Sequence, residues 1–408
     1  MKEYIDYKLA NGVKLIYKNT FSHLSSISIA LDAGAGRDFK EKLGIAHVTE
    51  HMIYKGTANR TEAEINKAFS SIFGFQNAMT NYPYVVYYGT LLDEDLAEGI
   101  ELFSDIITNP LLSENGFKEE MEIIKEELRE WDEEAEQYCE DQLFINAFSD
   151  RRIKYPIIGR MQDLEQINIQ DVKEFYASYY FPENTTITVI SAASFDKVKE
   201  IVEKYFASWE QNGKIEQDIL LEEPKGGKYI AKRNNINTSK ILMAFSLNEL
   251  SINELKLFRL FNEYFGEGIN SLLFDELRTK KALVYDVLTK ISNENYLNLY
   301  KITFSTAKEN ADLAIETINR IIKNLTEIIN SMEEEEIEQL VKKMKLRRYF
   351  IEEQSIRLAN LLSTYDRMFG DYKIYPAEVD FSSVVKKKEI IRVVEKLFKN
   401  PCIQIVEN

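Results

Sequence analysis

The sequence predicts an α+β fold of two homologous domains, each a mostly antiparallel sheet with helices packed on it, related as a duplicated half. Three observations lead to this prediction. The chain has 408 residues, whereas a single hydrophobic core stops growing at roughly 250–300 residues. Strand-like and helix-like runs occur in both halves. Short motifs of the first half also recur in the second.

The strand candidates are short runs rich in Val, Ile, Thr and Tyr, which favour a pleated, half-buried surface. In chain order they cover residues 12–17, 25–31, 85–92, 185–191, 240–247 and 296–304. The helix candidates carry apolar residues three or four positions apart, on one helical face. They cover residues 61–72, 95–107 and 119–148. Each half therefore combines strands with helices, as an α+β unit requires.

A repeated pattern relates the two halves of the chain. Asp95-Leu96-Ala97 recurs as Asp312-Leu313-Ala314, a displacement of 217 residues. Ser113 and Ser331, displaced by 218, each open a long helical pattern. The alternative is chance similarity between amphipathic helices, which could produce either match alone. A similar displacement for two separate motifs favours a duplication, the sequence signature of repeated architecture.

The two halves are joined by a polar stretch. Residues 212–228 are charged and interrupted by proline and glycine, a composition that is typical of a linker between domains. We therefore expect one domain over residues 1–211 and a homologous domain over residues 229–408.

Composition excludes several classes of function. The formal net charge is −16, from 67 acidic and 51 basic side chains, and this balance opposes binding to nucleic acid. The two cysteines, Cys139 and Cys402, form no CxxC spacing, so neither a disulfide framework nor a thiolate zinc site is expected. The first residues do not resemble a signal peptide, and no apolar run reaches the ~18 residues of a membrane span. A cytoplasmic protein without membrane or nucleic-acid partners is the expectation.

A histidine pair provides the first sign of chemistry. Two of the three histidines, His47 and His51, lie four residues apart in the segment HVTEH, and on a helix such positions share a face. Both imidazoles can therefore bind one ion. Glu50 is rotated by about 100° from His51 around the helix, where it borders the metal and can accept a proton from water. HxxEH is a zinc peptidase signature, so the pattern predicts a zinc site with Glu50 as general base.

The alternative for this segment is a surface helix with two histidines and no metal. A catalytic zinc site also needs a third protein ligand and an open fourth position. The acidic stretch 118–134 offers several carboxylates. Such a charge run is usually a solvated helix face, and composition alone does not choose a ligand among them.

Two further segments extend the pattern to a known family. With GFQNAMT at residues 74–80 and IIKEEL at residues 123–128, the chain closely resembles the pitrilysin/insulysin family of zinc metallopeptidases. Its length is similar to the half-length branch that contains mitochondrial processing peptidase and its bacterial relatives. The resemblance implies a zinc-binding catalytic first domain with one Zn²⁺ per chain.

The resemblance also implies the remaining groups of the zinc site. Glu127, 76 residues after His51, falls on the family's third ligand, with Glu126 as the rival. Glu120 lies two turns earlier on the same helical face and matches a carboxylate that orients a ligand. In the second half, the counterparts of the three predicted ligands His47, His51 and Glu127 are Tyr264, Gly268 and Lys345. Residues 229–408 are therefore expected to form a metal-free domain.

Substrate-contact residues are implied in both halves. Asn77 and Ala78 match a family segment beside the active site, where an edge strand pairs with extended substrate. Arg278 and Tyr285, within LFDELRTKKALVYDV, match an arginine and a tyrosine that face the substrate. One departure concerns residues 265–268, where Glu267 interrupts the glycines that many members carry in this region; it affects the carry-over of substrate preference and leaves the zinc site untouched.

Together these features predict a zinc-dependent endopeptidase that cleaves peptides or short unfolded precursors inside an enclosed chamber. Because the chain retains both the zinc ligands and the Arg278/Tyr285 pair, the resemblance implies a homodimer whose active site is shared between chains. The alternative is a non-catalytic scaffold or partner subunit of a peptidase complex. A hydrolase with a cysteine nucleophile is a third reading, which the acidic surroundings of Cys139 disfavour.

Overall fold

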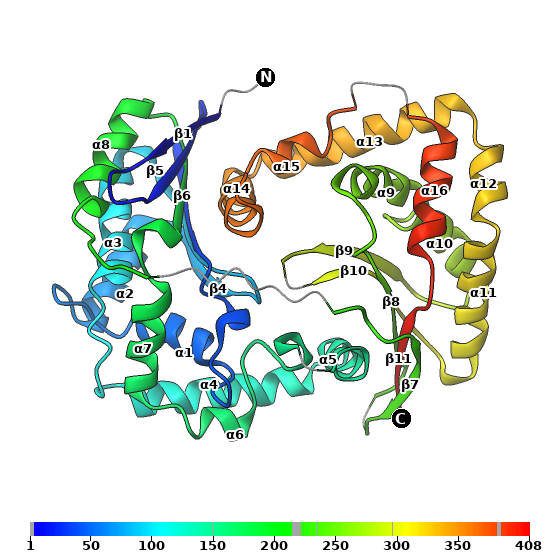
Figure 1. Cartoon of the computed structure of the whole chain (residues 1–408), viewed down its shortest axis with the longest axis horizontal. Helices are drawn as coiled ribbons and strands as arrows, with labels where there is room; N and C mark the ends of the chain where they lie inside the picture. The colour runs from blue at the N-terminus through cyan, green and yellow to red at the C-terminus, as the bar shows by residue number, and fades with distance from the viewer. Residues whose placement is uncertain (1–3, 150, 214–221, 235, 296, 382–384) are drawn as a thin grey trace. The chain divides into compact units, whose positions relative to one another are not determined.

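The computed structural model describes residues 4–149, 151–213, 222–234, 236–295, 297–381 and 385–408 (Figure 1). The chain packs into two compact units, each with its own sheet. The first unit contains residues 1–129, 156–218 and 350–377, and the second contains residues 130–155, 219–349 and 378–408. Each unit therefore takes segments from distant parts of the chain.

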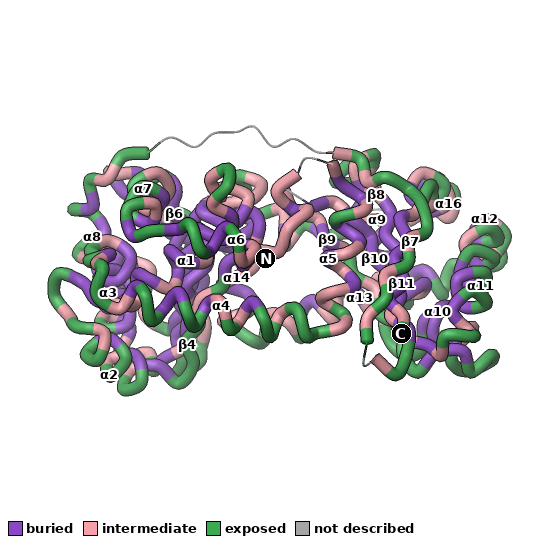
Figure 2. The backbone as a smooth tube through the Cα atoms, turned by 90° about the horizontal axis from the view of Figure 1, so that it is seen from below, coloured by how far each residue is buried: buried purple, intermediate pink, exposed green. Residues whose placement is uncertain are grey.

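The first unit is built on a six-stranded sheet. In hydrogen-bonding order its strands are β1 (Tyr4–Lys8), β2 (Lys14–Asn19), β6 (Thr185–Ser191), β3 (Leu24–Leu31), β5 (Val85–Leu92) and β4 (Phe73–Thr80). Neighbours run antiparallel except for the parallel pair β2 and β6. The run TTITVIS of β6 is buried along its whole length (Figure 2), as expected for a strand covered on both faces.

The sheet of the second unit repeats this arrangement with five strands. In order they are β7 (Gly227–Lys232), β11 (Cys402–Glu407), β8 (Ser239–Ser246), β10 (Asn298–Thr306) and β9 (Val287–Asn293). Here β7 and β11 are parallel and the other pairs are antiparallel. Strand for strand this matches β2, β6, β3, β5 and β4 in order and direction, so the predicted fold of two homologous α+β domains is confirmed.

Helices cover both sheets. Those of the first unit are α1 (Ile45–Met52), α2 (Glu62–Ile72), α3 (Leu96–Thr108), α4 (Phe117–Glu133, up to residue 129), α6 (Met161–Leu164), α7 (Ile169–Tyr179), α8 (Phe195–Phe206), α14 (Ser355–Phe369) and α15 (Ile374–Ala377). Those of the second unit are α5 (Ala135–Ala147), α9 (Ile252–Phe265), α10 (Leu272–Phe274), α11 (Ala311–Lys323), α12 (Leu325–Ser331), α13 (Glu334–Glu352, up to residue 349) and α16 (Lys387–Leu397).

One helix from each half of the chain covers the sheet built largely by the other half. In the first unit α14 packs on β3 and β6, where Ser363 Oγ lies 2.8 Å from Ser28 Oγ and Asp366 accepts a 2.8 Å hydrogen bond from Thr186. In the second unit α5 packs on β8 and β11, with Asn146 donating to Gln404 at 2.8 Å. The compact units are thus completed by a reciprocal exchange of helices.

The helical stretch expected over residues 119–148 is two helices. The chain leaves α4 at Glu134, which has extended backbone angles, and begins α5 at the next residue. Acidic side chains crowd this point, and like charges one turn apart destabilise a helix. Trp131 Nε1 donates to Asp141 across the break at 2.9 Å, which holds the bend.

The expected domain boundaries concern a different division of the chain. The predicted domains, residues 1–211 and 229–408, are two halves of the sequence related by duplication, and they stay a prediction. The two compact units are instead defined by which segments pack together in space. The expected linker over residues 212–228 falls partly on 214–221, outside the described residues, and β7 begins at Gly227.

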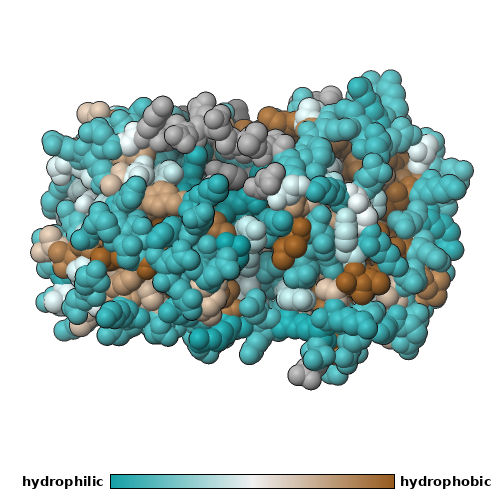
Figure 3. Space-filling model, turned by 60° about the horizontal axis from the view of Figure 1, so that its bottom comes forward, coloured by the Kyte–Doolittle hydropathy of each residue, from teal (hydrophilic) through white to brown (hydrophobic). Residues whose placement is uncertain are grey.

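The face shown in Figure 3 is mostly hydrophilic, with smaller groups of hydrophobic residues. Among the helices that the structure describes, none combines the length and the apolar character needed to cross a membrane. The expected cytoplasmic location stays a prediction.

Candidate metal centre

The predicted histidine pair lies on α1, whose start is shaped by a glycine and an aspartate. Gly44 precedes the helix with φ of +94°, and a Cβ there would meet the backbone oxygen of Ile158 at 2.3 Å. Asp38 accepts hydrogen bonds from the backbone N–H groups of Gly44 and Ala46 at 2.6 and 3.0 Å. These bonds satisfy donors that a helix N-terminus leaves free, so α1 begins at a defined residue.

Burial of α1 determines where the histidines point. Ile45, Val48 and Met52 are fully buried, and this apolar face fixes the rotation of the helix in the unit. His47 and His51 lie together on a partly exposed face, with ring centroids 4.5 Å apart. The spacing of four residues therefore brings the two imidazoles side by side, as the sequence predicts.

Glu127 of α4 completes a cluster with these histidines. One ligand atom from each of His47, His51 and Glu127 lies within 4.8 Å of the others. His51 Nε2 is 3.6 Å from Glu127 Oε2. Glu126, the rival, has a side chain that is 62% exposed and is paired with Arg129. The structure thus brings Glu127, and not Glu126, to the histidines.

The donor set fits a zinc ion. Two imidazoles and a carboxylate are a common catalytic zinc set, and bonds of about 2.0–2.1 Å place two tetrahedral ligand atoms about 3.3 Å apart. The 3.6 Å between His51 and Glu127 is close to that separation. The Nδ1 atom of His47 is buried and has no hydrogen-bond partner among the described residues, so this nitrogen carries no competing bond.

Electrostatics prepare the two histidines differently. Burial, followed by the nearby His51, lowers the pKa of His47 to about 3, so this ring is neutral at ordinary pH. Burial would also lower the pKa of His51, but its hydrogen bond with Glu120 and the charges of Glu50 and Glu127 outweigh burial and raise that pKa. Since a metal ligand must be deprotonated, protons compete at His51.

Glu120 contacts the back of the second histidine. Its Oε1 lies 2.7 Å from His51 Nδ1, the position predicted for an orienting carboxylate. Burial would raise the pKa of Glu120, but its bonds with His51 and Lys55 outweigh burial and lower it. The ionised carboxylate can therefore accept a hydrogen bond from Nδ1–H, which leaves Nε2 of His51 facing Glu127.

Glu50, the predicted base, is buried beside the cluster. Its side chain accepts a hydrogen bond from the hydroxyl of Thr80 on β4. Burial is the main cause that raises its pKa, and the Thr80 bond opposes that shift. A carboxylate with a raised pKa is better suited to accept and return a proton near neutral pH.

The predicted substrate contacts Asn77 and Ala78 lie on β4, at one edge of the first sheet. On one side β4 pairs with β5, and on its other side no described strand pairs with it. Phe75 and Met79 are 49% and 41% exposed. An exposed sheet edge of this kind can pair with an extended peptide, and Thr80 links the same strand to Glu50.

Arg278 and Tyr285 lie in the second unit, and the metal cluster lies in the first. Arg278 belongs to a π-helical turn over Asp275–Thr279. Its guanidinium stacks over the rings of Tyr285 at 4.8 Å and Phe274 at 4.9 Å. Tyr285 is 80% exposed. The structure therefore brings this predicted pair together as an exposed donor group.

Sequence reasoning missed two residues that contact the centre. Thr80 is the last residue of the segment GFQNAMT. It lies two residues after Ala78, and on a strand such positions point to the same face of the sheet, which was the available signal that Thr80 lies near the site. Lys55, which pairs with Glu120 at 2.5 Å, lies four residues after His51. That spacing would suggest a shared helical face, although α1 ends at Met52.

The two cysteines are poorly suited to act as nucleophiles. Both are buried free thiols, and burial raises the pKa of Cys139 to about 12 and that of Cys402 to about 11. Because the thiolate is the reactive form, these shifts oppose a cysteine mechanism.

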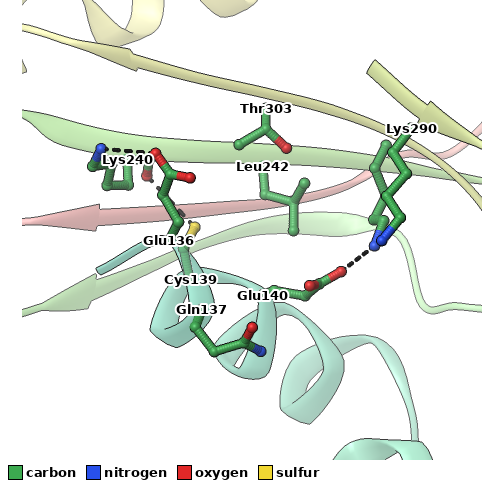
Figure 4. A pocket seen from close by; sticks show the side chains of 9 residues that line it. Glu136, Gln137, Cys139, Glu140, Lys240, Leu242, Lys290 and Thr303 are labelled. Atoms are coloured by element: carbon green, nitrogen blue, oxygen red, sulfur yellow. Dashed lines mark hydrogen bonds and ion pairs between the residues drawn. The ribbon is translucent and has the colours of Figure 1, made fainter. Parts of the chain in front are cut away.

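A separate cavity of about 220 Å³ lies in the second unit, where α5 faces the sheet (Figure 4). Two of its lysines are paired with carboxylates on α5: Lys240 with Glu136 at 3.1 Å, and Lys301 with Glu140. Cys139 lines this cavity, but none of the predicted zinc-site or substrate-contact residues does, and the cavity is not part of the candidate centre.

Comparison with protein families matches most of the chain. Residues 14–160 match the Insulinase family, Peptidase family M16, and residues 166–344 match the Peptidase M16 inactive domain. The first match contains the whole metal cluster together with Glu50.

Known proteins and structures resemble the chain along much of its length. The uncharacterized zinc protease YmxG of Bacillus subtilis is 26% identical over 321 residues, 78% of each chain. An uncharacterized zinc protease of Rickettsia felis is 26% identical over 396 residues, 96% of this chain and 94% of its own. The mitochondrial-processing peptidase beta subunit of Saccharomyces cerevisiae is 27% identical over 247 residues, 58% and 52% of the two chains. The crystal structure of a protease from Helicobacter pylori shares the fold with a TM-score of 0.91, at 20% identity and full coverage of both chains.

Proposed function

Because the chain belongs to the insulinase family of peptidases, family M16, as its motifs predict, we propose that it is a zinc-dependent endopeptidase acting on peptides or short unfolded precursors. The observation that carries the proposal is the clustering of His47, His51 and Glu127 within 4.8 Å, with buried Glu50 one residue before the second histidine. Scaffold proteins need neither the three donors nor the base.

In the proposed mechanism His47, His51 and Glu127 would hold one zinc ion, which when bound would supply a Lewis acid for peptide hydrolysis. Glu50 accepts a proton from the attacking water and returns it to the leaving amine. Thr80 holds the carboxylate of Glu50 in place for both transfers. Burial of Glu50 limits competing water and strengthens its contacts with neighbouring charges.

Two groups would hold the substrate. The β4 edge at Asn77 and Ala78 would pair with the backbone of an extended peptide. Arg278 and Tyr285 would donate hydrogen bonds to a peptide carbonyl or to the negative charge that develops on it. The exposure of β4 and of Tyr285 supports both assignments.

The test is cleavage of a mixed peptide pool, followed by mass spectrometry, for the wild type and for Glu50→Gln at equal zinc content. We expect cleavage by the wild type and its loss, by about 1,000-fold or more, in the variant, since proton transfer contributes roughly 10²–10⁴-fold. Zinc bound by both proteins with equal cleavage would refute Glu50 as the base. Absence of zinc and of cleavage in the wild type would instead favour a non-catalytic scaffold or partner subunit.

We further propose a homodimer that encloses a chamber, in which the Arg278/Tyr285 pair of one chain serves the zinc centre of its partner. The support is that one chain carries both groups. Arg278→Ala and Glu50→Gln should each be inactive alone, and mixing them should restore up to about a quarter of the wild-type activity, the share of intact sites in randomly mixed dimers. Mixed dimers without recovery would refute the shared site.

A further inference from the structure

We propose that Lys55 is a positioning residue of the metal centre, which holds Glu120 so that Glu120 can orient His51. The inference rests on the proposed function, because it concerns the affinity of that same site for zinc. It adds a residue outside the motif HVTEH and outside the ligand set.

A continuous line of polar contacts leads away from the cluster. Glu120 places Oε1 at 2.7 Å from His51 Nδ1 and Oε2 at 2.5 Å from Lys55 Nζ. Lys55 Nζ also lies 2.8 Å from Glu62 Oε1, in the first turn of α2. One carboxylate is therefore shared between an imidazole and an ammonium group, with one oxygen for each.

Because Lys55 binds the oxygen of Glu120 that His51 does not contact, it can fix the orientation of the carboxylate. A carboxylate that is held by one bond can rotate, whereas a second bond to the other oxygen fixes its plane. With the plane of Glu120 fixed, its Oε1 accepts a hydrogen bond from the Nδ1–H group of His51, so the Nε2 lone pair points to the side where Glu127 lies 3.6 Å away. Partners of this kind set the tautomer and orientation of metal-binding histidines.

The surroundings keep Lys55 in place. The residue lies in the turn after α1, where its backbone N–H donates to Met52 O at 3.2 Å. Its side chain is only 15% exposed, and that of Glu120 only 10%, compared with 45% for Glu62. Charge-assisted bonds between weakly hydrated groups are among the stronger protein hydrogen bonds.

The rival explanation is that Lys55 only ties the end of α1 to the start of α2. The two contacts of the ammonium group separate these roles, since Glu62 belongs to the tie and Glu120 to the metal centre. Glu62→Gln weakens the first contact and leaves the second. Lys55→Gln removes the ammonium charge from both, and Lys55→Arg restores a cation.

The experiment measures the zinc dissociation constant of the full chain by competition with a chromogenic chelator at pH 7.5, with circular dichroism to show that each variant is folded. Lys14→Gln is the matched control, because Lys14 is 25% exposed and pairs with Asp366, which is no part of the metal centre. We expect Lys55→Gln to bind zinc about 10-fold more weakly, at the lower end of the effect of such outer partners. Lys55→Arg, Glu62→Gln and Lys14→Gln should stay within about threefold of the wild type on the same scale.

Equal zinc affinity of Lys55→Gln and the wild type would overturn the inference, as would an equal loss in Glu62→Gln. The visible spectrum of the cobalt-substituted chain gives a second readout, in which Lys55→Gln should shift the absorption bands and Lys14→Gln should not. Failure of the proposed function is distinguishable, because it would appear as absent zinc binding in the wild type itself.

Discussion

His51 Nδ1 and Glu120 Oε1 lie 2.7 Å apart, although 69 residues separate them in the chain. Glu127 follows Glu120 by seven residues on the same helix, and two turns bring both to one face. Helix α4 therefore supplies both a predicted ligand and the group that orients another. A small rotation of this helix would disturb two contacts of the centre at once.

Replacing Glu127 tests the ligand set directly. Glu127→Gln should weaken zinc binding by about 100-fold or more, because a neutral amide oxygen is a poorer ligand than a carboxylate. Glu126→Gln is the adjacent control, since that side chain is exposed and paired with Arg129. Zinc titration of both variants decides the assignment, and an equal loss in the two would contradict it.

The hydrogen bond from Thr80 should appear in the pH profile of peptide cleavage. Burial raises the pKa of Glu50 and the Thr80 bond opposes this, so Thr80→Val should raise that pKa further. In the proposed mechanism Glu50 must be ionised to accept a proton, so the acid limb of kcat/KM should move to higher pH in this variant. Thr80→Ser keeps the hydroxyl and should keep the profile; a limb unchanged in Thr80→Val would refute the role.

The start of α1 should tolerate no side chain at Gly44. Gly44 and Gly116 both have positive φ, but a Cβ at Gly44 would lie 2.3 Å from a backbone oxygen, whereas at Gly116 the nearest atom is 3.9 Å away. Gly116→Ala should lower the free energy of unfolding by about 1–2 kcal/mol, from backbone strain alone. Gly44→Ala should lower the free energy of unfolding by more than this, because of the added steric clash, and should also weaken zinc binding. Urea unfolding and zinc titration of both variants measure these effects. Equal losses of stability in the two variants would argue against the steric explanation.

Asp141 should titrate at unusually high pH. Burial raises its pKa from 3.8 to about 6, against hydrogen bonds from Trp131 and Gln137. The folded chain thus holds this proton more tightly than the unfolded chain. Its contribution to stability is complete below pH 3.8 and is lost as the pH rises through about 6.

The fluorescence of Trp131 reports this titration, because its indole N–H bonds to Asp141. In a Trp209→Phe background Trp131 is the remaining tryptophan, and its emission should change with a midpoint near pH 6. Asp141→Asn should abolish the transition. A midpoint near 4 would show that Asp141 is solvated in solution.

Much of the fold follows from local pattern. The run TTITVIS marks β6 because β-branched residues favour a buried strand, and Thr61 opens α2 with a capping box to Glu64. The reciprocal exchange of α5 and α14 could not be predicted. An apolar helix face, such as the one that carries Leu358 and Leu362 in α14, indicates burial but does not specify the sheet that it covers.

The candidate site likewise contains residues that local sequence pattern predicts and residues that it does not. The histidines are four residues apart, so helix geometry alone placed them together. Glu127 came only from the family resemblance, because a separation of 76 residues contains no information about distance in space. Lys55 and Thr80 act through contacts between separate elements, and their residue types are common on any protein surface.

The position of α14 has a consequence for how the protein is made. A ribosome releases residues 47–127, with every predicted zinc ligand, long before residues 355–369 can cover the sheet beneath them. Until then Ile190 and its neighbours lack the helix that buries them. We expect an unfinished chain to lack a stably folded first unit until α14 has left the ribosome and buried this cluster.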